Sequence, residues 1–412
     1  MNFEWFVSKR LINAKDYKSS ISAPIIKIAI TAIAIGVVMM LVSVATGFGL
    51  QQKIRDKIAA FKGHISISNF DNNNSQISIK PIADTQEFRN RLDRVDGITE
   101  IQPVITKYGV IRTEKDFEGV VVKGVKPDYR WESFEEFLVE GNIPKYKDRS
   151  YSDEILLSQY IADRLGFKIG DKVVVYFMNN PEQERPRPTG FTLVGIFSSG
   201  FQEFDETYLI ADLQQLQRIN KWKKNQVGMF EIYIDDFDQL EQKGGEINAN
   251  ITSFLEAKTI EQSYESIFEW ISLFDFNIFL IICVMILVSG INMITALLVL
   301  ILERTPMIGM LKALGSENWS IRKIFLYNAT YLILKGLFWG NLIGLGLLLA
   351  QKYFKIIPLN PETYYVSEAP VYLNWDYILL INLGTLLLCL AMLIIPSVII
   401  TKINPTKAIK FE

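Results

Sequence analysis

Side chains that could do catalytic or metal chemistry are scarce in this sequence. His64 is the only histidine among 412 residues, which argues against histidine-based triads and multi-histidine metal sites. The sequence contains no G-x-x-x-x-G-K-[ST] loop and no G-x-S-x-G motif, and its acidic residues show no diagnostic spacing. We therefore expect no catalytic residue, metal site or cofactor in this chain. His64, beside Gly63, is interpreted as a structural polar cap between a helix and a strand.

Four long apolar windows dominate the rest of the sequence. The windows are Ile28–Leu50, Phe276–Leu302, Ile324–Gln351 and Tyr377–Thr401. The third window contains one charged residue, Lys335, and the other three contain none. About 20 apolar residues are enough to cross a bilayer as a helix, so each window predicts a transmembrane helix. A signal peptide is the alternative for the first window. That window is too long for a typical signal core, and no clean small-residue cleavage site follows it.

The expected fold class is an integral membrane protein with four transmembrane α-helices and a large α+β extracytoplasmic domain between helices one and two. Residues 51–270 have an ordinary globular composition and predict two subdomains, with a late strand returning to pair with the first. The expected segments are a cytoplasmic amphipathic helix at 1–24, a first span at 25–50, the domain at 51–270, a second span at 271–302, a cytoplasmic helix at 303–320, a third span at 321–351, a short outer loop at 352–376, a fourth span at 377–401 and a cytoplasmic tail at 402–412.

Lysine and arginine in the short loops set the expected orientation. They gather before the first window, after the second and after the fourth, whereas the loop after the third holds only Lys352 and Lys355. The positive-inside rule then places both termini in the cytoplasm and residues 51–270 outside. These outer residues carry 28 basic and 36 acidic side chains, and this acidic balance argues against nucleic acid as a partner.

The stretch LERTPMIGMLKALGS, residues 302–316, lies between the second and third windows and resembles neither. It begins with charge, continues with apolar residues at helical spacing and ends at a glycine. The pattern predicts one short amphipathic helix, and a plain amphipathic loop at the membrane surface is the alternative. Its candidate contact residues are Glu303, Arg304, Met307, Ile308, Met310, Leu311, Leu314 and Gly315.

A second unusual stretch, NNPEQERPRPTG at residues 179–190, lies between two predicted strands. Prolines stiffen a hairpin and prevent additional strands from pairing with it, so the stretch could be a rigid protrusion offered to a partner. A plain long hairpin is the alternative. Its candidate residues are Pro181, Arg185, Pro186, Arg187 and Pro188.

Within the membrane windows, Gly336, Gly340 and Gly344 repeat every four residues, a spacing that lets helices approach closely. Glycine tolerated on a lipid-facing side is the alternative. Lys335 near the middle of this window could face a cavity or partner, or its long stem could extend to the interface. The apolar outer ends of helices one and two are a candidate acyl-facing surface, with ordinary helix or lipid contact as the alternative; the residues are Met40, Val44, Phe48, Phe274, Ile278 and Ile282.

The whole arrangement resembles the MacB/FtsX-like permeases of ABC transporters, and within them the lipoprotein-releasing permeases of the LolC/LolE type. Four segments carry the resemblance in order: residues 6–48, then GHISI, then ERTPMIGMLKALGS, then INPTKAIKFE. The sequence departs from the family at Thr305-Pro306-Met307, where an acidic–apolar pair is usual.

The resemblance implies a permease that extracts lipoproteins from the inner membrane and passes them to a periplasmic carrier. It implies that the helix at 303–320 couples to a separate ATPase, present in two copies, which binds the ATP and magnesium. A second permease, identical or homologous, would complete the transporter, and the hairpin at 179–190 would hook the carrier. The alternative within the family is mechanotransmission of the MacB or FtsX kind, which drives an efflux partner or a cell-wall hydrolase. An enzyme anchored by four helices is disfavoured because catalytic motifs are missing.

Overall fold

The structure is a computed structural model that describes residues 3–13, 22–72, 77–147, 150–177 and 186–403. The chain divides into two compact units. A helical unit comprises residues 1–51, 270–358 and 368–412, and a mixed unit comprises residues 52–269 and 359–367. Parts of the expected N-terminal segment, of the hairpin at 179–190 and of the C-terminal tail lie outside the described residues.

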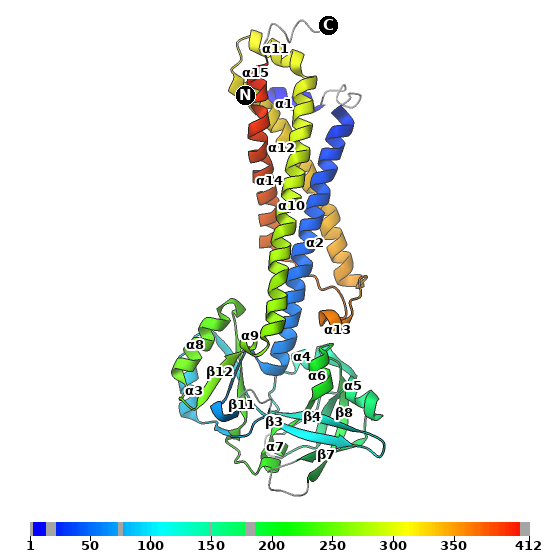
Figure 1. The fold of residues 1–412 in the computed structure, drawn as a ribbon, viewed down its shortest axis with the longest axis vertical. Helices are drawn as coiled ribbons and strands as arrows, with labels where there is room; N and C mark the ends of the chain where they lie inside the picture. Colours follow the sequence, from blue (N-terminus) through cyan, green and yellow to red (C-terminus); the bar gives the residue numbers. More distant parts are fainter. Residues whose placement is uncertain (1–2, 14–21, 73–76, 148–149, 178–185, 404–412) are drawn as a thin grey trace. The chain divides into compact units, whose positions relative to one another are not determined.

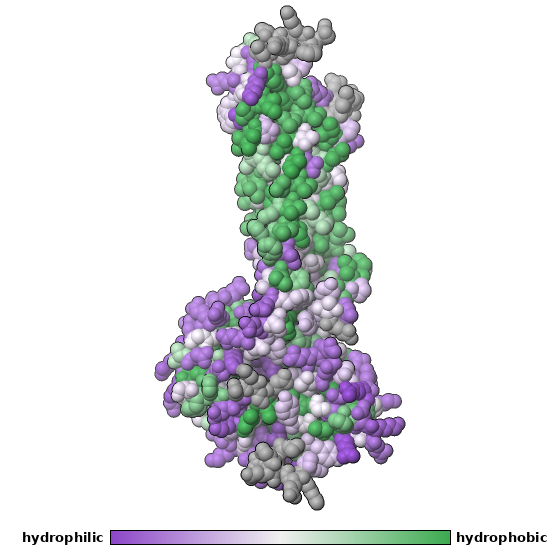
Figure 2. Space-filling view, in the orientation of Figure 1, coloured by the Kyte–Doolittle hydropathy of each residue, from purple (hydrophilic) through white to green (hydrophobic). Residues whose placement is uncertain are grey.

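The helical unit is built from long helices that run side by side (Figure 1). Among the described residues, four helices are long and apolar enough to cross a membrane. They are α2 (Ser22–Lys62), α10 (Glu265–Glu303), α12 (Asn318–Phe354) and α14 (Trp375–Ser397), the last followed by α15 (Ile399–Lys402). Hydrophobic residues cover the visible face of this bundle (Figure 2). Two short helices, α1 (Phe3–Asn13) and α11 (Thr305–Ala313), complete the unit.

The core of the helical unit lies between the long helices. Ile33, Met293, Phe325 and Leu393 come from four different helices and are buried together. One pair of polar side chains in this region satisfies its own hydrogen bonds, as a site without water requires. Asn341 of α12 and Asn382 of α14 exchange side-chain hydrogen bonds of 2.6 and 2.9 Å.

The mixed unit combines strands with short helices. Its elements are β1 (Ile65–Asn69), β2 (Ile82–Ala83), α3 (Gln86–Leu92), β3 (Ile98–Arg112), β4 (Phe117–Val125), α4 (Glu132–Phe137), β5 (Leu138–Gly141), β6 (Glu154–Ser158), α5 (Gln159–Leu165), β7 (Lys172–Phe177), β8 (Arg187–Phe197), α6 (Gln202–Thr207), β9 (Tyr208–Asp212), α7 (Leu213–Asn220), β10 (Gln226–Val227), β11 (Met229–Ile234), α8 (Leu240–Asn250), β12 (Leu255–Thr259), α9 (Ile260–Ser263) and α13 (Pro361–Tyr364), with single 3₁₀ turns at Phe70–Asn72 and Phe237–Gln239.

Strand β3 organises the sheet. Its first half pairs with β11 and its second half with β4 and β7, giving the order β12-β1-β11-β3-β4-β9-β6-β8-β5. Helices α3 and α8 lie beside the β11 end, and α5 and α6 lie beside the β4 and β8 end (Figure 1). The return of a late strand to the first is confirmed, because β11 pairs antiparallel with β1 and aligns Ile232 with Ile65.

The helix α2 ends where the sequence predicts, at a glycine. Gly63 adopts a φ of +67°, a left-handed conformation that a residue without a Cβ adopts at little cost, and its N–H donates to the carbonyl of Ala59. Just before it, Phe61 is fully buried against an aromatic cluster. The ring centroids of Phe134 and Phe204 lie 5.1 and 4.5 Å from that of Phe61. This packing fixes the last turn of α2 in the core of the mixed unit.

Candidate functional site

Most of the stretch at residues 302–316 folds as α11, with a local sequence signal at each end of the helix. Pro306 occupies the first turn, where a missing backbone N–H costs nothing, and the Thr305 hydroxyl donates to the carbonyl of Leu302 at 2.8 Å. At the other end, Gly315 has a φ of +90° and its N–H donates to the carbonyl of Lys312. Ser316 closes the turn by donating to the carbonyl of Leu311, a pattern typical of a helix terminated by glycine.

The apolar residues of α11 divide between two faces, and the division corrects part of the expected contact surface. Ile308 is 0% exposed and belongs to the core of the helical unit, with Met307 and Leu311 packed partly against that core. Met310 is 54% exposed and Leu314 is 84% exposed. Ile308 therefore holds α11 to its own chain, because a helix linked closely to two neighbours must bury one side against them. Met310 and Leu314 keep most of their apolar surface free for another molecule.

The flanking residues of α11 are more exposed than its inner face. Glu303, the last residue of α10, and Gly315 are both exposed, and Arg304 is half-buried at the start of α11. Leu302, one residue before Glu303, is also exposed. The accessible side thus combines charge at one end with apolar side chains along its length.

Lys312 attaches α11 to the C-terminal end of the helical unit. Its ammonium donates to the carbonyls of Ile400, Ile403 and Thr401 at 2.7, 2.9 and 3.2 Å. These carbonyls lie at the C-terminal end of α15, and a cation favours the negative end of a helix. Sequence reasoning counted Lys312 only as a topology charge, because its partners lie about 90 positions away and no local pattern marks them.

Helix α1 is attached to the same region. Glu4 accepts a hydrogen bond of 2.7 Å from the Ser320 hydroxyl and forms an ion pair with Lys323 at 3.6 Å. Trp5 contacts Tyr327 edge-on at 5.9 Å. Both α1 and α11 therefore lie near the start of α12.

The three glycines at four-residue spacing lie against α2. A Cβ at Gly336 would stand 2.7 Å from the Cβ of Ile33, and one at Gly340 would stand 2.9 Å from the carbonyl oxygen of Ala34. A Cβ at Gly344 would meet the side chain of Leu41 at 3.0 Å. The residue numbers of the contacting positions increase together on both helices, so α2 and α12 run parallel with their backbones close. By contrast, Gly346 has open space around it.

The candidate acyl-facing surface is wrong for half of its members. Met40, Val44 and Ile278 are buried in the core of the helical unit. Phe48 and Ile282 pack partly against the same core, and Phe48 stacks on Tyr377 at 4.7 Å; Phe274 is half-buried beside Trp270. A helix that is apolar all round gives no signal of which side faces lipid, so composition could not select the face.

The proline-rich stretch at 179–190 is described only at its end. Pro181 and Arg185 lie outside the described residues, whereas Pro186 directly precedes β8. Arg187 and Pro188 are the first residues of β8 and align with Phe177 and Tyr176 of β7. These two residues therefore belong to the strand ladder and not to a protruding loop. The role of the remaining segment as a hook stays a prediction.

A deeply buried ion pair of the mixed unit was missed by sequence reasoning. Lys123 and Glu231 form an ion pair of 2.7 Å, and each side chain is 1% exposed. The Lys123 ammonium also donates to the carbonyl of Phe61 at 2.7 Å and to the Tyr129 hydroxyl at 2.8 Å. Burial lowers the pKa of Lys123 to about 8, and the attraction of Glu231 opposes that shift.

This cluster supplies side-chain donors to the carbonyls at the end of α2. The Tyr129 hydroxyl donates to the carbonyl of Ala60 at 3.0 Å, and the Tyr233 hydroxyl donates to that of Ala59 at 3.2 Å. With Lys123 on Phe61, three successive carbonyls of the last helical turn have side-chain donors. No group of three or more histidine, cysteine or acidic side chains suited to a metal ion occurs among the described residues.

Two family models match the chain in succession. The MacB-like periplasmic core domain matches residues 28–249, which is more than half of the chain, and the FtsX-like permease C-terminal domain matches residues 279–405. The chain belongs to the MacB/FtsX superfamily of permeases. The first match spans most of the mixed unit, and the second covers α11, α12 and α14.

Curated relatives place this permease within the superfamily. The lipoprotein-releasing system transmembrane protein LolC of Neisseria meningitidis is 23% identical over 439 residues, and the alignment covers 100% of both chains. LolE of Haemophilus influenzae is 22% identical over 99% of both chains. The protein is thus a permease of the LolC/LolE type, similar to both members. Among solved structures, the periplasmic region of MacB from Actinobacillus actinomycetemcomitans is 13% identical, with a TM-score of 0.33 over 49% of this chain and 91% of that one.

Proposed function

We propose that this LolC/LolE-type permease is a membrane subunit of an inner-membrane ABC transporter that releases lipoproteins and is driven by a separate ATPase. Membership of the superfamily supports a permease of an ABC system, and the names of the full-length relatives support lipoprotein release. Moving an acyl chain out of a bilayer into water costs about 0.8 kcal/mol per CH₂. A transporter that does this needs an energy source outside the chain.

The exposed face of α11 is the observation on which the coupling depends. Met310 and Leu314 point away from the helical unit, while Ile308 and Lys312 hold the opposite side to it. A helix fixed in this way can transmit a push from a bound partner, because it does not need to be ordered first. In the proposed orientation, α11 and both termini lie in the cytoplasm, and the mixed unit lies in the periplasm.

The proposed assembly holds two copies of the ATPase, which bind ATP and magnesium, and a second permease, identical or homologous. The hairpin at 179–190 recruits a periplasmic carrier that accepts the lipoprotein.

Copurification tests the coupling surface. The double variant Met310→Asp/Leu314→Asp places two charges on the exposed face, and we expect it to enter the membrane and fold but to lose the ATPase on affinity purification. Ile356→Asp is the matched control, since Ile356 is equally accessible in the loop after α12. The variant Ile308→Asp is unsuitable for this purpose, because it places a charge in the core. Retention of the ATPase by the double variant at the parental level would refute the assignment of this face.

Lipoprotein release is measured separately from ATPase binding. Spheroplasts that carry the parental complex and a soluble carrier should release labelled lipoprotein when ATP is supplied, and the double variant should not. An intact ATPase complex without any release, and without lipoprotein in the mass spectrum of the purified complex, would exclude transport but leave the coupling surface valid.

Mechanotransmission is a second candidate, and the end of α2 favours it. The same helix that supplies the first candidate span, Pro24–Lys62, ends in a fully buried and capped turn. Such an end suits transmission of movement along the helix. Under this candidate, the double variant Met310→Asp/Leu314→Asp would abolish the activation of an efflux partner or a hydrolase, while lipoprotein release would be absent from the parental complex as well.

A further inference from the structure

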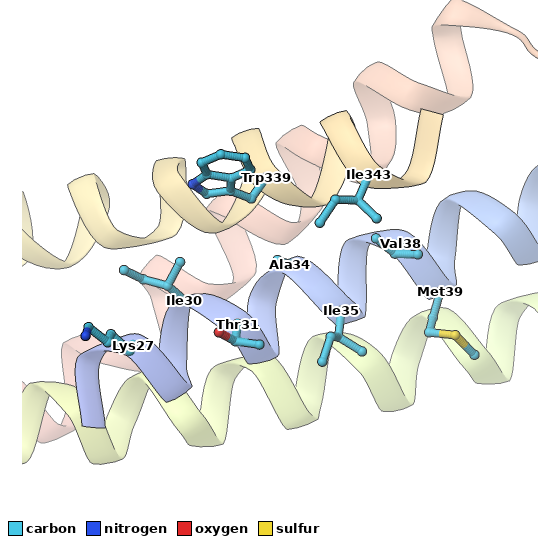
Figure 3. A pocket seen from close by; sticks show the side chains of 9 residues that line it. All are labelled: Lys27, Ile30, Thr31, Ala34, Ile35, Val38, Met39, Trp339 and Ile343. Atoms are coloured by element: carbon cyan, nitrogen blue, oxygen red, sulfur yellow. The ribbon is translucent and has the colours of Figure 1, made fainter. Parts of the chain in front are cut away.

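An open groove lies along the helical unit between α2 and α12 (Figure 3). Its volume is about 500 Å³, and its walls are mostly apolar. Ile30, Ala34 and Val38 line it from α2, while Trp339 and Ile343 line it from α12. The glycine contacts described above bring the same two helices close together.

One end of the groove is basic. Lys27 lines the groove at this end, one turn before Thr31, and the indole nitrogen of Trp339 faces the same end in Figure 3. Lys335 is four residues before Trp339, so it lies on the same ridge of α12 one turn nearer to that end. Its ammonium lies over the ring of Tyr331, 4.5 Å from the centroid, and therefore extends towards the N-terminal end of α12.

The two lysines approach this end from opposite walls. Gly336 stands level with Ile30 and Ile33 of α2, which places Lys335 beside the turn that follows Lys27. Both side chains are exposed, and neither forms an ion pair with any residue that the structure describes. A cation within or at the edge of an apolar span is costly unless it meets a negative group, so these two ammonium groups favour an anionic ligand.

We infer that the groove binds one anionic phospholipid, with an acyl chain along the aliphatic walls and the phosphate between Lys27 and Lys335. The lipid belongs to the leaflet on the side of α11, because the basic end of the groove is the end of α2 and α12 nearest to their N-termini. Charge complementarity selects this occupant over a zwitterionic lipid, since two cations at one end attract a net negative headgroup.

Lipid retention by the purified full-length chain tests this inference. The protein is titrated in detergent with dioleoyl phosphatidylglycerol or dioleoyl phosphatidylcholine, and bound lipid is counted by native mass spectrometry. We expect the parental chain to retain the anionic lipid preferentially. The double variant Lys27→Gln/Lys335→Gln should weaken its retention at least tenfold, with roughly fivefold from each lysine. Lys352→Gln is the matched control, because Lys352 is exposed on the same helix at its opposite end.

A second variant tests the groove itself without changing charge. Thr31→Trp places a bulky side chain in the α2 wall, and it should abolish retention of the anionic lipid while both lysines remain. Thr31 is exposed, so the helix core is left intact and the melting temperature reports folding.

Three results would overturn the inference: equal retention of both lipids by the parental chain, unchanged retention in the lysine double variant, or unchanged retention in Thr31→Trp. Loss of a dimer in Thr31→Trp with unchanged lipid retention would instead identify a second copy of the chain as the occupant.

Discussion

Lys123 of β4 and Glu231 of β11 form an ion pair of 2.7 Å with both side chains buried, beside the last turn of α2. Two strands of the same sheet, separated by β3, thus contribute opposite charges to one helix end. The pair does more than neutralise itself, because the ammonium also binds the carbonyl of Phe61. A cation at this end is attracted to the negative C-terminal end of the α2 dipole.

Removing the ammonium should destabilise the mixed unit strongly. Lys123→Met leaves Glu231 charged and unpaired in the core, which typically costs about 3–5 kcal/mol. The double variant Lys123→Met/Glu231→Gln removes both charges and should recover most of that loss. Thermal unfolding of the full-length protein in detergent, followed for both variants, gives the comparison. Equal melting temperatures for the single and double variants would mean that the ion pair contributes little coupling.

His64 should make the stability of the mixed unit depend on pH. Its Nδ1 accepts a hydrogen bond of 3.0 Å from the N–H of Ile234, which requires the neutral ring. Burial, together with the nearby Arg130, lowers the pKa of His64 to about 4. The unfolded chain binds the proton near pH 6.5, so stability falls as the pH drops from 6.5 towards 4.

The expected loss from His64 between pH 7.5 and pH 5 is about 2 kcal/mol. His64→Asn keeps an acceptor near the same place but cannot titrate, so this part of the pH dependence should vanish in the variant. Chemical unfolding at the two pH values, in parent and variant, isolates the contribution because all other titrating groups are shared. The same pH dependence in both proteins would assign it to groups other than His64.

Bulky side chains should not be tolerated where α12 meets α2. Gly340→Leu would bring its Cβ within 3 Å of the Ala34 carbonyl and the Val37 side chain, and overpacking of this kind typically costs about 1–3 kcal/mol. Gly346→Leu on the same helix meets nothing within 4 Å and should leave the melting temperature unchanged. If the two variants melt alike, the close approach of the helices is not required for stability.

The asparagine pair between α12 and α14 should contribute a smaller amount. Asn382→Leu leaves Asn341 with one hydrogen bond, to the carbonyl of Leu337, and hydrogen bonds between membrane helices average about 0.6 kcal/mol. The double variant Asn341→Leu/Asn382→Leu should be no less stable than the single one. A double-mutant cycle on melting temperatures measures the coupling, and strictly additive effects would show that the pair is not coupled.

Several elements could be predicted because their signals are local. An apolar run of more than 20 residues predicts a membrane helix without information about its neighbours. Gly63 and Gly315 mark helix ends through backbone conformation alone. The pairing of β11 with β1 followed from the order of strands and helices.

The sites were harder to predict, since they depend on neighbours that are distant in sequence. The apolar spacing of α11 defined one face, but it could not say that Ile308 would be covered by its own bundle. Lys123 and Glu231 are 108 positions apart and show no shared pattern before the sheet brings them together. In the all-apolar helices even the buried face gave no signal, which is why Met40 and Val44 were misplaced.

The short segment 359–367, which joins the mixed unit although it lies between α12 and α14 in sequence, has a mechanical consequence. Tyr365 stacks on Phe201 at 4.6 Å and its carbonyl accepts a hydrogen bond from Lys57, so the segment is fastened within the mixed unit. The backbone therefore passes between the two units four times instead of twice. Four connections restrict the relative movement of two units more than the two connections of an ordinary inserted domain. A single cut within the segment would open the connection through it and leave the continuous backbone through α2 and α10 in place.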